Sequence, residues 1–272
     1  MEAFFLQAAR GQRFCVHHAP QGAPGAGIVF VPALAEEMNK SRHIVAQTAR
    51  RLAASGVGVL LIDLFGCGDS SGSLADVRWA DWRADIRLGL DWMRQRNYRS
   101  LQLWGQRTGA VLAAEMAHDN PGAVRRCLFW QPVVGGEAIL TQFLRLRSVN
   151  ALLTGSGGSE SVKQLRARLI AGELLEVAGY PLSPALAADL AGLNLERANP
   201  LCPVHWIELV AEVGRAASAA SARVLSAWQA QGTDVSMSLL AAEQFWAASN
   251  AVELVQCPSI VEKTVQEVAV WH

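Results

Sequence analysis

The residue whose position most strongly suggests chemistry in this sequence is Arg107, in the stretch LWGQRTGA. It stands midway between Gly105 and Gly109, after a short β-prone run and before an alanine-rich stretch typical of a helix. A strand, a tight turn with a glycine at each end, and a helix together form the layout of a nucleophile elbow. Glycines are needed there because the turn residue is strained and because strand and helix approach closely.

The middle residue of such an elbow normally carries the nucleophilic atom of a hydrolase. A guanidinium is permanently charged and has only donors, so Arg107 cannot attack a carbonyl carbon. Thr108 offers a hydroxyl, but inside the first helical turn that hydroxyl is better suited to capping backbone groups. The sequence therefore predicts the scaffold of a hydrolase site without its usual nucleophile.

The acid and the base of an acyl-hydrolase site are expected in loops after two later strands. After the strand VHWIELVAE, Glu212 is the better-placed acid, because Glu208 falls within the strand itself. A histidine is expected after VSMSLLAA, yet the loop there reads Glu243, Gln244, Phe245 and Trp246. Of the six histidines, the sequence places only His43 near the site. A serine triad is thus missing its nucleophile and its base.

Acidic side chains are expected beside Arg107 and leave three roles open for it. Glu36 and Glu37 belong to the loop that usually forms the oxyanion wall, and Glu243 belongs to the base loop. In the first interpretation, an Arg–Glu network fills the catalytic pocket. In the second, Arg107 clamps a carboxylate or a phosphate with two hydrogen bonds. In the third, Glu37 or Glu243 activates water as a general base.

These considerations define a catalytic and a binding set of candidates. The catalytic candidates are Arg107, Glu37, Glu243 and Glu212. The candidates for binding a substrate or an anion are Glu36, Asn39, Gln106, Thr108, Phe245 and Trp246. The two aromatic residues either line a hydrophobic tunnel beneath a cap or belong to the core. The spacing of cysteines and histidines supports no metal site, and no cofactor is expected.

Alternating strand and helix patterns surround this turn. Unbroken apolar runs bounded by turn residues suit strands that are buried on both faces, and they occur at residues 28–31, 57–62 and 124–130. Apolar residues recur at helical spacing over about 41–55 and 79–95. This alternation predicts a mostly parallel sheet with helices on both faces. His17 and His18 end a short strand near the N-terminus and are expected at the surface or at the edge of the sheet.

A region of helical character interrupts the alternation at about residues 135–203. It contains a GSGGSE link at 155–160 and a short helix that Ser183 and Pro184 begin and Gly192 closes. We interpret it as a cap inserted between strands. The expected division is a core of 1–134 and 204–272 with a helical cap of 135–203.

The composition restricts the classes of partner. Lys plus Arg and Asp plus Glu both total 24, so no basic excess points to nucleic acid. No apolar run approaches the ~20 residues of a membrane span, and the N-terminus does not resemble a signal peptide. The five cysteines are scattered and odd in number, which favours buried free thiols in a reducing cytoplasm. A small acyl or carboxylate ligand, a second copy of the chain and another protein remain open as partners.

Four stretches carry a resemblance to a known family: FVPALAEEMNKSR, DLFGCGDSSG, LWGQRTGA and the FW…CP segment near the end. They resemble the exosortase-A-system-associated hydrolase 2 family, and nearly the whole chain looks like an α/β-hydrolase. The EEMNKSR stretch is the most specific of these signals. The resemblance implies an α/β-hydrolase fold in a bacterial protein encoded beside exosortase, PEP-CTERM sorting and exopolysaccharide genes.

Two classes of function follow. The resemblance implies a hydrolase or another acyl-handling enzyme that acts on an ester or thioester in the exosortase-linked exopolysaccharide pathway. Arg107 and the missing base histidine instead favour a catalytically inactive relative that binds a ligand or serves as a scaffold.

Overall fold

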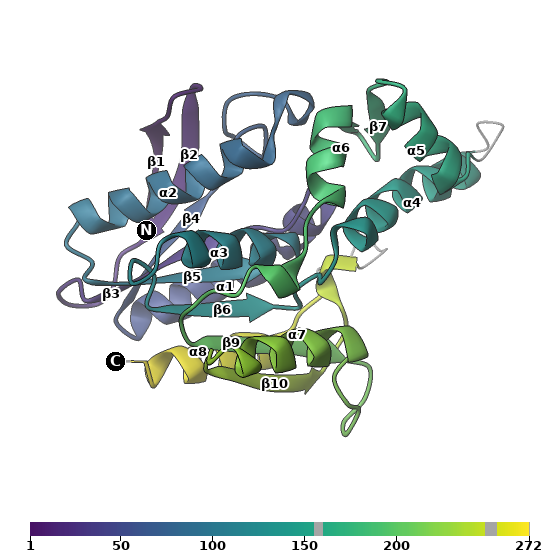
Figure 1. Ribbon diagram of the computed structural model, residues 1–272. Helices are drawn as coiled ribbons and strands as arrows, with labels where there is room; N and C mark the ends of the chain where they lie inside the picture. Colours follow the sequence, from purple (N-terminus) through teal and green to yellow (C-terminus); the bar gives the residue numbers. More distant parts are fainter. Residues whose placement is uncertain (155–159, 248–254, 272) are drawn as a thin grey trace.

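The structure, a computed structural model, describes residues 1–154, 160–247 and 255–271 (Figure 1). Its centre is one eight-stranded sheet. In their order across the sheet, the strands are β1 (Glu2–Gln7), β2 (Gln12–His18), β4 (Val57–Ile62), β3 (Ala26–Val31), β5 (Ser100–Gln106), β6 (Arg126–Trp130), β9 (Val204–Val210) and β10 (Val235–Ala241). Neighbours from β4 to β10 run parallel, whereas β2 is antiparallel to both β1 and β4. The predicted mostly parallel sheet is confirmed.

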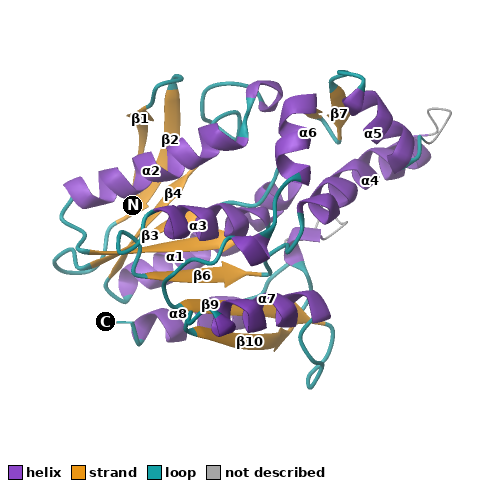
Figure 2. Ribbon diagram, in the orientation of Figure 1, coloured by secondary structure: helices purple, strands orange, loops and turns teal. Residues whose placement is uncertain are grey.

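The helices of the sheet layers cover both of its faces (Figure 2). They are α1 (Glu36–Ala54), α2 (Trp79–Gln95), α3 (Thr108–Asp119), α7 (Ala219–Ala230) and α8 (Pro258–Ala269), with 3₁₀ turns η1 (Leu74–Asp76), η2 (Leu195–Arg197) and η3 (Phe245–Ala247). Helices α2, α3 and α7 pack into one apolar cluster, and α1 and α8 pack into the other. Strands β3 and β9 are buried along their whole length because both faces are covered.

Helix α1 begins earlier than predicted, at Glu36 rather than Ser41. The EEMNKSR stretch is therefore the start of a helix and not a loop. Its many polar residues conceal the buried positions Met38, Ser41 and Val45, which follow helical spacing. Acidic side chains in a first turn are favourable because they face the positive end of the helix dipole. This correction places Glu36 and Glu37 on a rigid element.

Within the described residues, three helices and a β-hairpin lie between β6 and β9, followed by the 3₁₀ turn η2. In Figure 1 they lie beyond the carboxyl end of β6, which the arrowhead marks. They are helix α4 (Gly136–Thr154), helix α5 (Val162–Ile170), a hairpin of β7 (Leu175–Val177) and β8 (Tyr180–Leu182), and helix α6 (Pro184–Ala191). The predicted cap of the last helix by Ser183 and its end at Gly192 are confirmed. The hairpin was not predicted. Most of the expected GSGGSE link, residues 155–159, lies outside the described residues.

Specific contacts fasten this segment to the sheet layers. The guanidinium of Arg78, before α2, donates two hydrogen bonds of 2.8 and 2.9 Å to the carboxylate of Asp189 on α6. The backbone N–H of Trp79 donates to the same carboxylate at 3.0 Å. The phenol of Tyr180 in the hairpin reaches the first turn of α1. The segment is therefore anchored at its hairpin and at its last helix.

His17 and His18 are buried, so the prediction that they lie at the surface is wrong. The ring of His17 packs edge-on against Trp92, and its Nε2 shares a 2.8 Å hydrogen bond with the hydroxyl of Tyr98. Strand β2 lies inside the sheet, between β1 and β4, and this position buries the two imidazoles. The polar type of the residues suggested exposure, whereas the topology determines burial.

Burial of His17 predicts a loss of stability in acid. Burial first, and the nearby Arg96 second, lower the pKa of His17 from 6.5 to about 4. Because the unfolded chain binds this proton at higher pH than the folded chain, stability falls as the pH drops from about 6.5 towards 4. We expect the free energy of unfolding to fall by about 2 kcal/mol between pH 7 and pH 5 through this group.

Urea unfolding of the wild type and of His17→Gln at both pH values measures this contribution. In the variant, most of the decrease in the free energy of unfolding should disappear. A remainder is expected from His18, because burial lowers its pKa as well. An unchanged pH dependence in His17→Gln would contradict the assignment.

Candidate functional site

The turn between β5 and α3 has the strained geometry of a nucleophile elbow. Arg107 occupies its apex with φ of 54° and ψ of −115°, a conformation that non-glycine residues rarely adopt. A Cβ on Gly109 would lie 2.2 Å from the carbonyl oxygen of Val31, and one on Gly105 would lie 2.5 Å from the Cα of Ala110. Both glycines are therefore required by the close approach of helix and strand.

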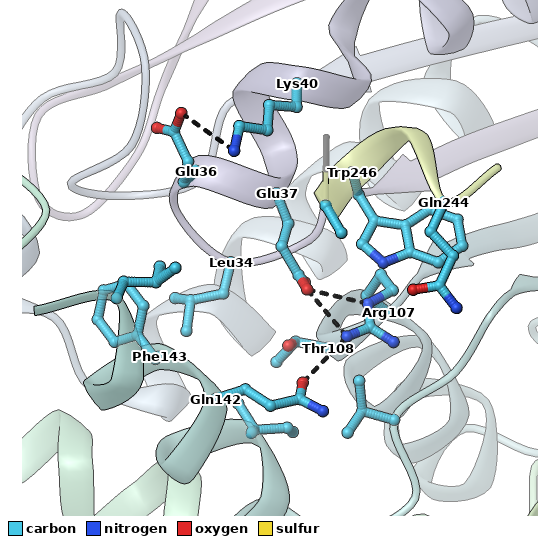
Figure 3. Close-up of a pocket in the computed structure, with 14 residues that line it drawn as sticks. Leu34, Glu36, Glu37, Lys40, Arg107, Thr108, Gln142, Phe143, Gln244 and Trp246 are labelled. Atoms are coloured by element: carbon cyan, nitrogen blue, oxygen red, sulfur yellow. Dashed lines mark hydrogen bonds and ion pairs between the residues drawn. The ribbon is translucent and has the colours of Figure 1, made fainter. Parts of the chain in front are cut away.

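The guanidinium of Arg107 is held in an ion pair with Glu37 at the start of α1 (Figure 3). Its Nη2 and Nε donate to Oε1 of Glu37 at 2.9 and 3.1 Å. Nη2 also donates to Oε1 of Gln142 on α4 at 3.1 Å, and the guanidinium carbon lies 5.3 Å from the ring centre of Trp246. Only 12% of the Arg107 side chain is exposed, so solvent ions screen this pair less than a fully exposed salt bridge.

A pocket of about 290 Å³ opens beside this ion pair. One wall is a stripe of α4 formed by Ile139, Gln142, Phe143 and Leu146, whose spacing puts them on one helix face. Leu34, Val133 and Trp246 add further apolar lining. The volume lies at the lower end of the range for ligand pockets, about 300–1,000 Å³, so the pocket suits a small, mostly apolar molecule.

A second charged pair, Glu36 and Lys40 on α1, also lines the pocket. Lys40 Nζ lies 3.8 Å from Oε1 of Glu36, one helical turn away on α1. The hydroxyl of Tyr180 donates to Oε2 of Glu36 at 3.2 Å and accepts from Nδ2 of Asn39 at 2.6 Å. Burial, followed by the charge of Glu36, raises the pKa of Tyr180 to about 12, so the phenol stays protonated. Asn39 thus contacts the hairpin and does not line the pocket.

The structure brings five of the predicted site residues together around the pocket: Glu36, Glu37, Arg107, Thr108 and Trp246. Gln106 and Phe245 belong to the core instead. The amide of Gln106 donates to the hydroxyl of Ser41 at 2.7 Å, and the ring of Phe245 packs against those of Trp130 and Trp246. Of the two aromatic residues expected in a tunnel, only Trp246 faces a cavity.

The other predicted carboxylates do not reach the pocket. Glu243 and Glu212 are exposed in the turns after β10 and β9, and neither lines the cavity. Glu208 is buried and accepts the backbone N–H of Ser218 at 2.8 Å, which makes it a structural group. His43 is directed to the carbonyl oxygen of Val255, at 2.7 Å. Among the described residues, no serine, cysteine or histidine lines the pocket.

Nine lining residues were absent from the predicted set: Leu34, Lys40, Val133, Ile139, Gln142, Phe143, Leu146, Gln244 and Ala247. Lys40 stands within the EEMNKSR stretch and was read as part of a loop. Gln142 and Phe143 lie on α4, in the segment between β6 and β9, where no sequence pattern tells which helix face lies toward the elbow. Gln244 occupies the loop in which a base histidine was expected, and its position in that loop was the available signal.

The strand order, the elbow between β5 and α3 and the helical segment after β6 define an α/β-hydrolase fold. Residues 22–167, more than half of the chain, match the family described as serine aminopeptidase, S33. The chain therefore belongs to this family of the α/β-hydrolase superfamily. The elbow residue Arg107 departs from the serine that the family description names.

Solved structures share the fold over almost the whole chain. Est1E from Butyrivibrio proteoclasticus with bound ferulic acid aligns with a TM-score of 0.69 at 15% identity, covering 99% of this chain and 97% of that one. Mouse α/β-hydrolase domain-containing protein 10 aligns with a TM-score of 0.61 at 14% identity, covering 100% of both chains. Proline iminopeptidase from Mycobacterium smegmatis aligns with a TM-score of 0.60 at 12% identity, covering 99% and 97%. At these identities the likeness shows the fold alone.

No curated protein matches the sequence. Within the described ranges, no helix has the length and apolar character needed to cross a membrane.

Proposed function

We propose that this protein binds small neutral acyl compounds, such as esters or thioesters, in the pocket beside Arg107, and that it does not form an acyl-enzyme at the elbow. The observation that carries the proposal is the ion pair of Arg107 and Glu37 at the position of the hydrolase nucleophile. A guanidinium has no lone pair to offer a carbonyl carbon. Its hydrogen bonds to Glu37 and Gln142 also fix the polar end of the pocket.

The charges of the pocket favour a neutral ligand over an anion. Arg107 is neutralised by Glu37, and Lys40 is neutralised by Glu36, so the lining carries two opposed pairs and no net charge. A free carboxylate would approach two glutamates at short range and would have to displace one of them. An uncharged ester loses less hydration on entry and can use the apolar stripe of α4.

Two backbone positions support binding of a carbonyl oxygen. In α/β-hydrolases the oxyanion is bound by the N–H of the residue after the elbow and by one from the loop after β3. Thr108 follows the elbow residue and Leu34 belongs to the loop after β3, and both line the pocket. Thr108 is also the first residue of α3, where the helix dipole favours partial negative charge.

Calorimetric titration with methyl hexanoate and with hexanoate tests the proposal. We expect the ester to bind at least about tenfold more tightly than the acid, a difference of about 1.4 kcal/mol. Leu146→Trp, which fills the pocket, should abolish binding, whereas Ile170→Trp on the exposed part of α5 should not change it. Binding that Leu146→Trp leaves unchanged, or a preference for the acid, would overturn the proposal.

A hydrolase that works without a serine is the second candidate, and the environment of Glu37 favours it. Its carboxylate faces the pocket, keeps 26% of its side chain exposed and is oriented by Arg107. An oriented carboxylate can act as a general base on water. In that mechanism Glu37→Gln would abolish turnover of esters or thioesters while the pocket still binds them.

The resemblance to exosortase-A-system-associated hydrolase 2 supports a place in the exosortase-linked exopolysaccharide pathway, in the cytoplasm. In the same proposal, residues 135–203 serve as the cap over the pocket, because α4 supplies one of its walls. The gene neighbourhood provides the check on the pathway. A genome that carries this gene but no exosortase gene would contradict the link.

A further inference from the structure

Two of the cysteines lie in contact although they are 75 positions apart in the sequence. The Sγ atoms of Cys127 and Cys202 are 3.8 Å apart. Cys127 is in β6 and fully buried, while Cys202 is partly exposed just before β9. The parallel pairing of these strands holds them together, since the N–H of Cys127 donates to the carbonyl oxygen of Pro203 at 2.9 Å. The spacing of the scattered cysteines did not predict this pair.

The surroundings of the two thiols differ in a way that assigns them different roles. The hydrogen bond from Cys127, and then the positive charge of Arg126, lower the pKa of Cys202. Complete burial, together with the neighbouring Cys202 sulfur, raises the pKa of Cys127. A thiolate is the reactive form of cysteine, so Cys202 is the attacking group and Cys127 the resolving one. By contrast, burial first and the charge of Asp63 second raise the pKa values of Cys15 and Cys67 to about 12.

We propose that Cys127 and Cys202 form a reversible redox site that hydrogen peroxide or a comparable two-electron oxidant converts into a disulfide. The Cys202 thiolate attacks one peroxide oxygen, which breaks the O–O bond and gives a sulfenic acid and, after protonation of hydroxide, one water. The Cys127 sulfur then attacks the Cys202 sulfur and breaks its S–O bond. The hydroxyl leaves with the proton of Cys127 as a second water. Two thiols are oxidised and one peroxide is reduced.

The position of the pair connects this chemistry to the pocket. The chain between the cysteines contains α4, α5, the β7–β8 hairpin and α6, so a disulfide would close a loop around the whole segment. Helix α4 forms one wall of the pocket. Because cross-linking restricts the unfolded chain, we expect the disulfide to raise Tm by about 5–10 °C. Oxidation would thereby stabilise the folded state, in which helix α4 lies against the pocket.

Peptide mapping of the full chain after brief treatment with hydrogen peroxide tests the proposal. Thiols that remain free are alkylated under denaturing conditions before digestion. We expect the peptides of Cys127 and Cys202 to be joined, three of the five thiols to remain alkylatable, and dithiothreitol to reverse both changes. The rise in Tm should persist in Cys257→Ser and be absent in Cys202→Ser.

Two results would overturn the redox site. One is a Cys202 that reaches only sulfenic or sulfinic acid, with no joined peptide. The other is a cross-link that joins a different pair of cysteines. Because the wild-type mapping needs no substitution, the outcome does not depend on whether a variant folds.

Discussion

Glu37→Gln is expected to convert the pocket from one that prefers neutral esters into one that binds carboxylates. The substitution keeps the size of the side chain but removes the charge that neutralises Arg107. The guanidinium, which belongs to a side chain that is 12% exposed, would then face the pocket without its counter-ion and would attract an anion in bidentate geometry. We expect the affinity for hexanoate to rise about 10- to 100-fold, or about 1.4–2.8 kcal/mol.

The affinity for methyl hexanoate should change little in the same variant, because the apolar stripe of α4 is untouched. Glu243→Gln is a matched control, since that glutamate is exposed and does not line the pocket. Calorimetric titration of both variants with both ligands measures the change in preference. If Glu37→Gln bound hexanoate no better than the control variant, the charge of Glu37 would not be what prevents Arg107 from binding a carboxylate.

Gly109→Ala is expected to destabilise the fold more than any single change on the pocket surface. The added Cβ would lie 2.2 Å from the carbonyl oxygen of Val31 and 2.4 Å from that of Pro32. Both atoms belong to the backbone at the end of β3, so no side-chain rotation can relieve the contact. Helix α3 would have to move away from the sheet, and we expect a loss of about 3 kcal/mol or more in the free energy of unfolding.

Denaturant unfolding followed by circular dichroism measures this loss. Gly25→Ala provides the control, because no heavy atom lies within 4 Å of its added Cβ and its φ is not positive. A midpoint for Gly109→Ala that equals that of Gly25→Ala would show that helix and strand do not approach as closely as the structure places them.

Much of the fold follows from local patterns in the sequence. The apolar run at 57–62 coincides with β4, and the helical pattern at 79–95 coincides with α2. A strand buried on two faces gives an unbroken apolar run, whereas a helix buried on one face gives apolar residues at helical spacing. The two glycines around Arg107 located the elbow because only a close backbone approach demands them. Features that depend on neighbours distant in sequence were harder to predict. The burial of His17 and the contact of Cys127 with Cys202 are examples.

The pocket was predictable in part. Its centre lies at the elbow and beside the segment that follows β3, which adjoin in this fold, so Arg107 and Glu37 could be expected to meet. Its wall of α4 residues could not be predicted, because the orientation of an inserted helix depends on anchors such as Arg78 with Asp189. Glu243 and Glu212 were placed correctly in their loops, but the side chains extend into solvent. Position in a loop does not fix the direction of a side chain.

The most direct test of the central claim is the release of p-nitrophenolate from p-nitrophenyl hexanoate by the wild type, Arg107→Ala and Glu37→Gln. We predict that all three proteins release p-nitrophenolate at the rate of buffer alone, with no initial burst. The wild-type preparation must first be shown to bind methyl hexanoate. An arginine at the elbow offers no atom that can carry an acyl group. Turnover by the wild type that either substitution abolishes would contradict this account and would instead establish hydrolysis driven by the carboxylate–arginine pair.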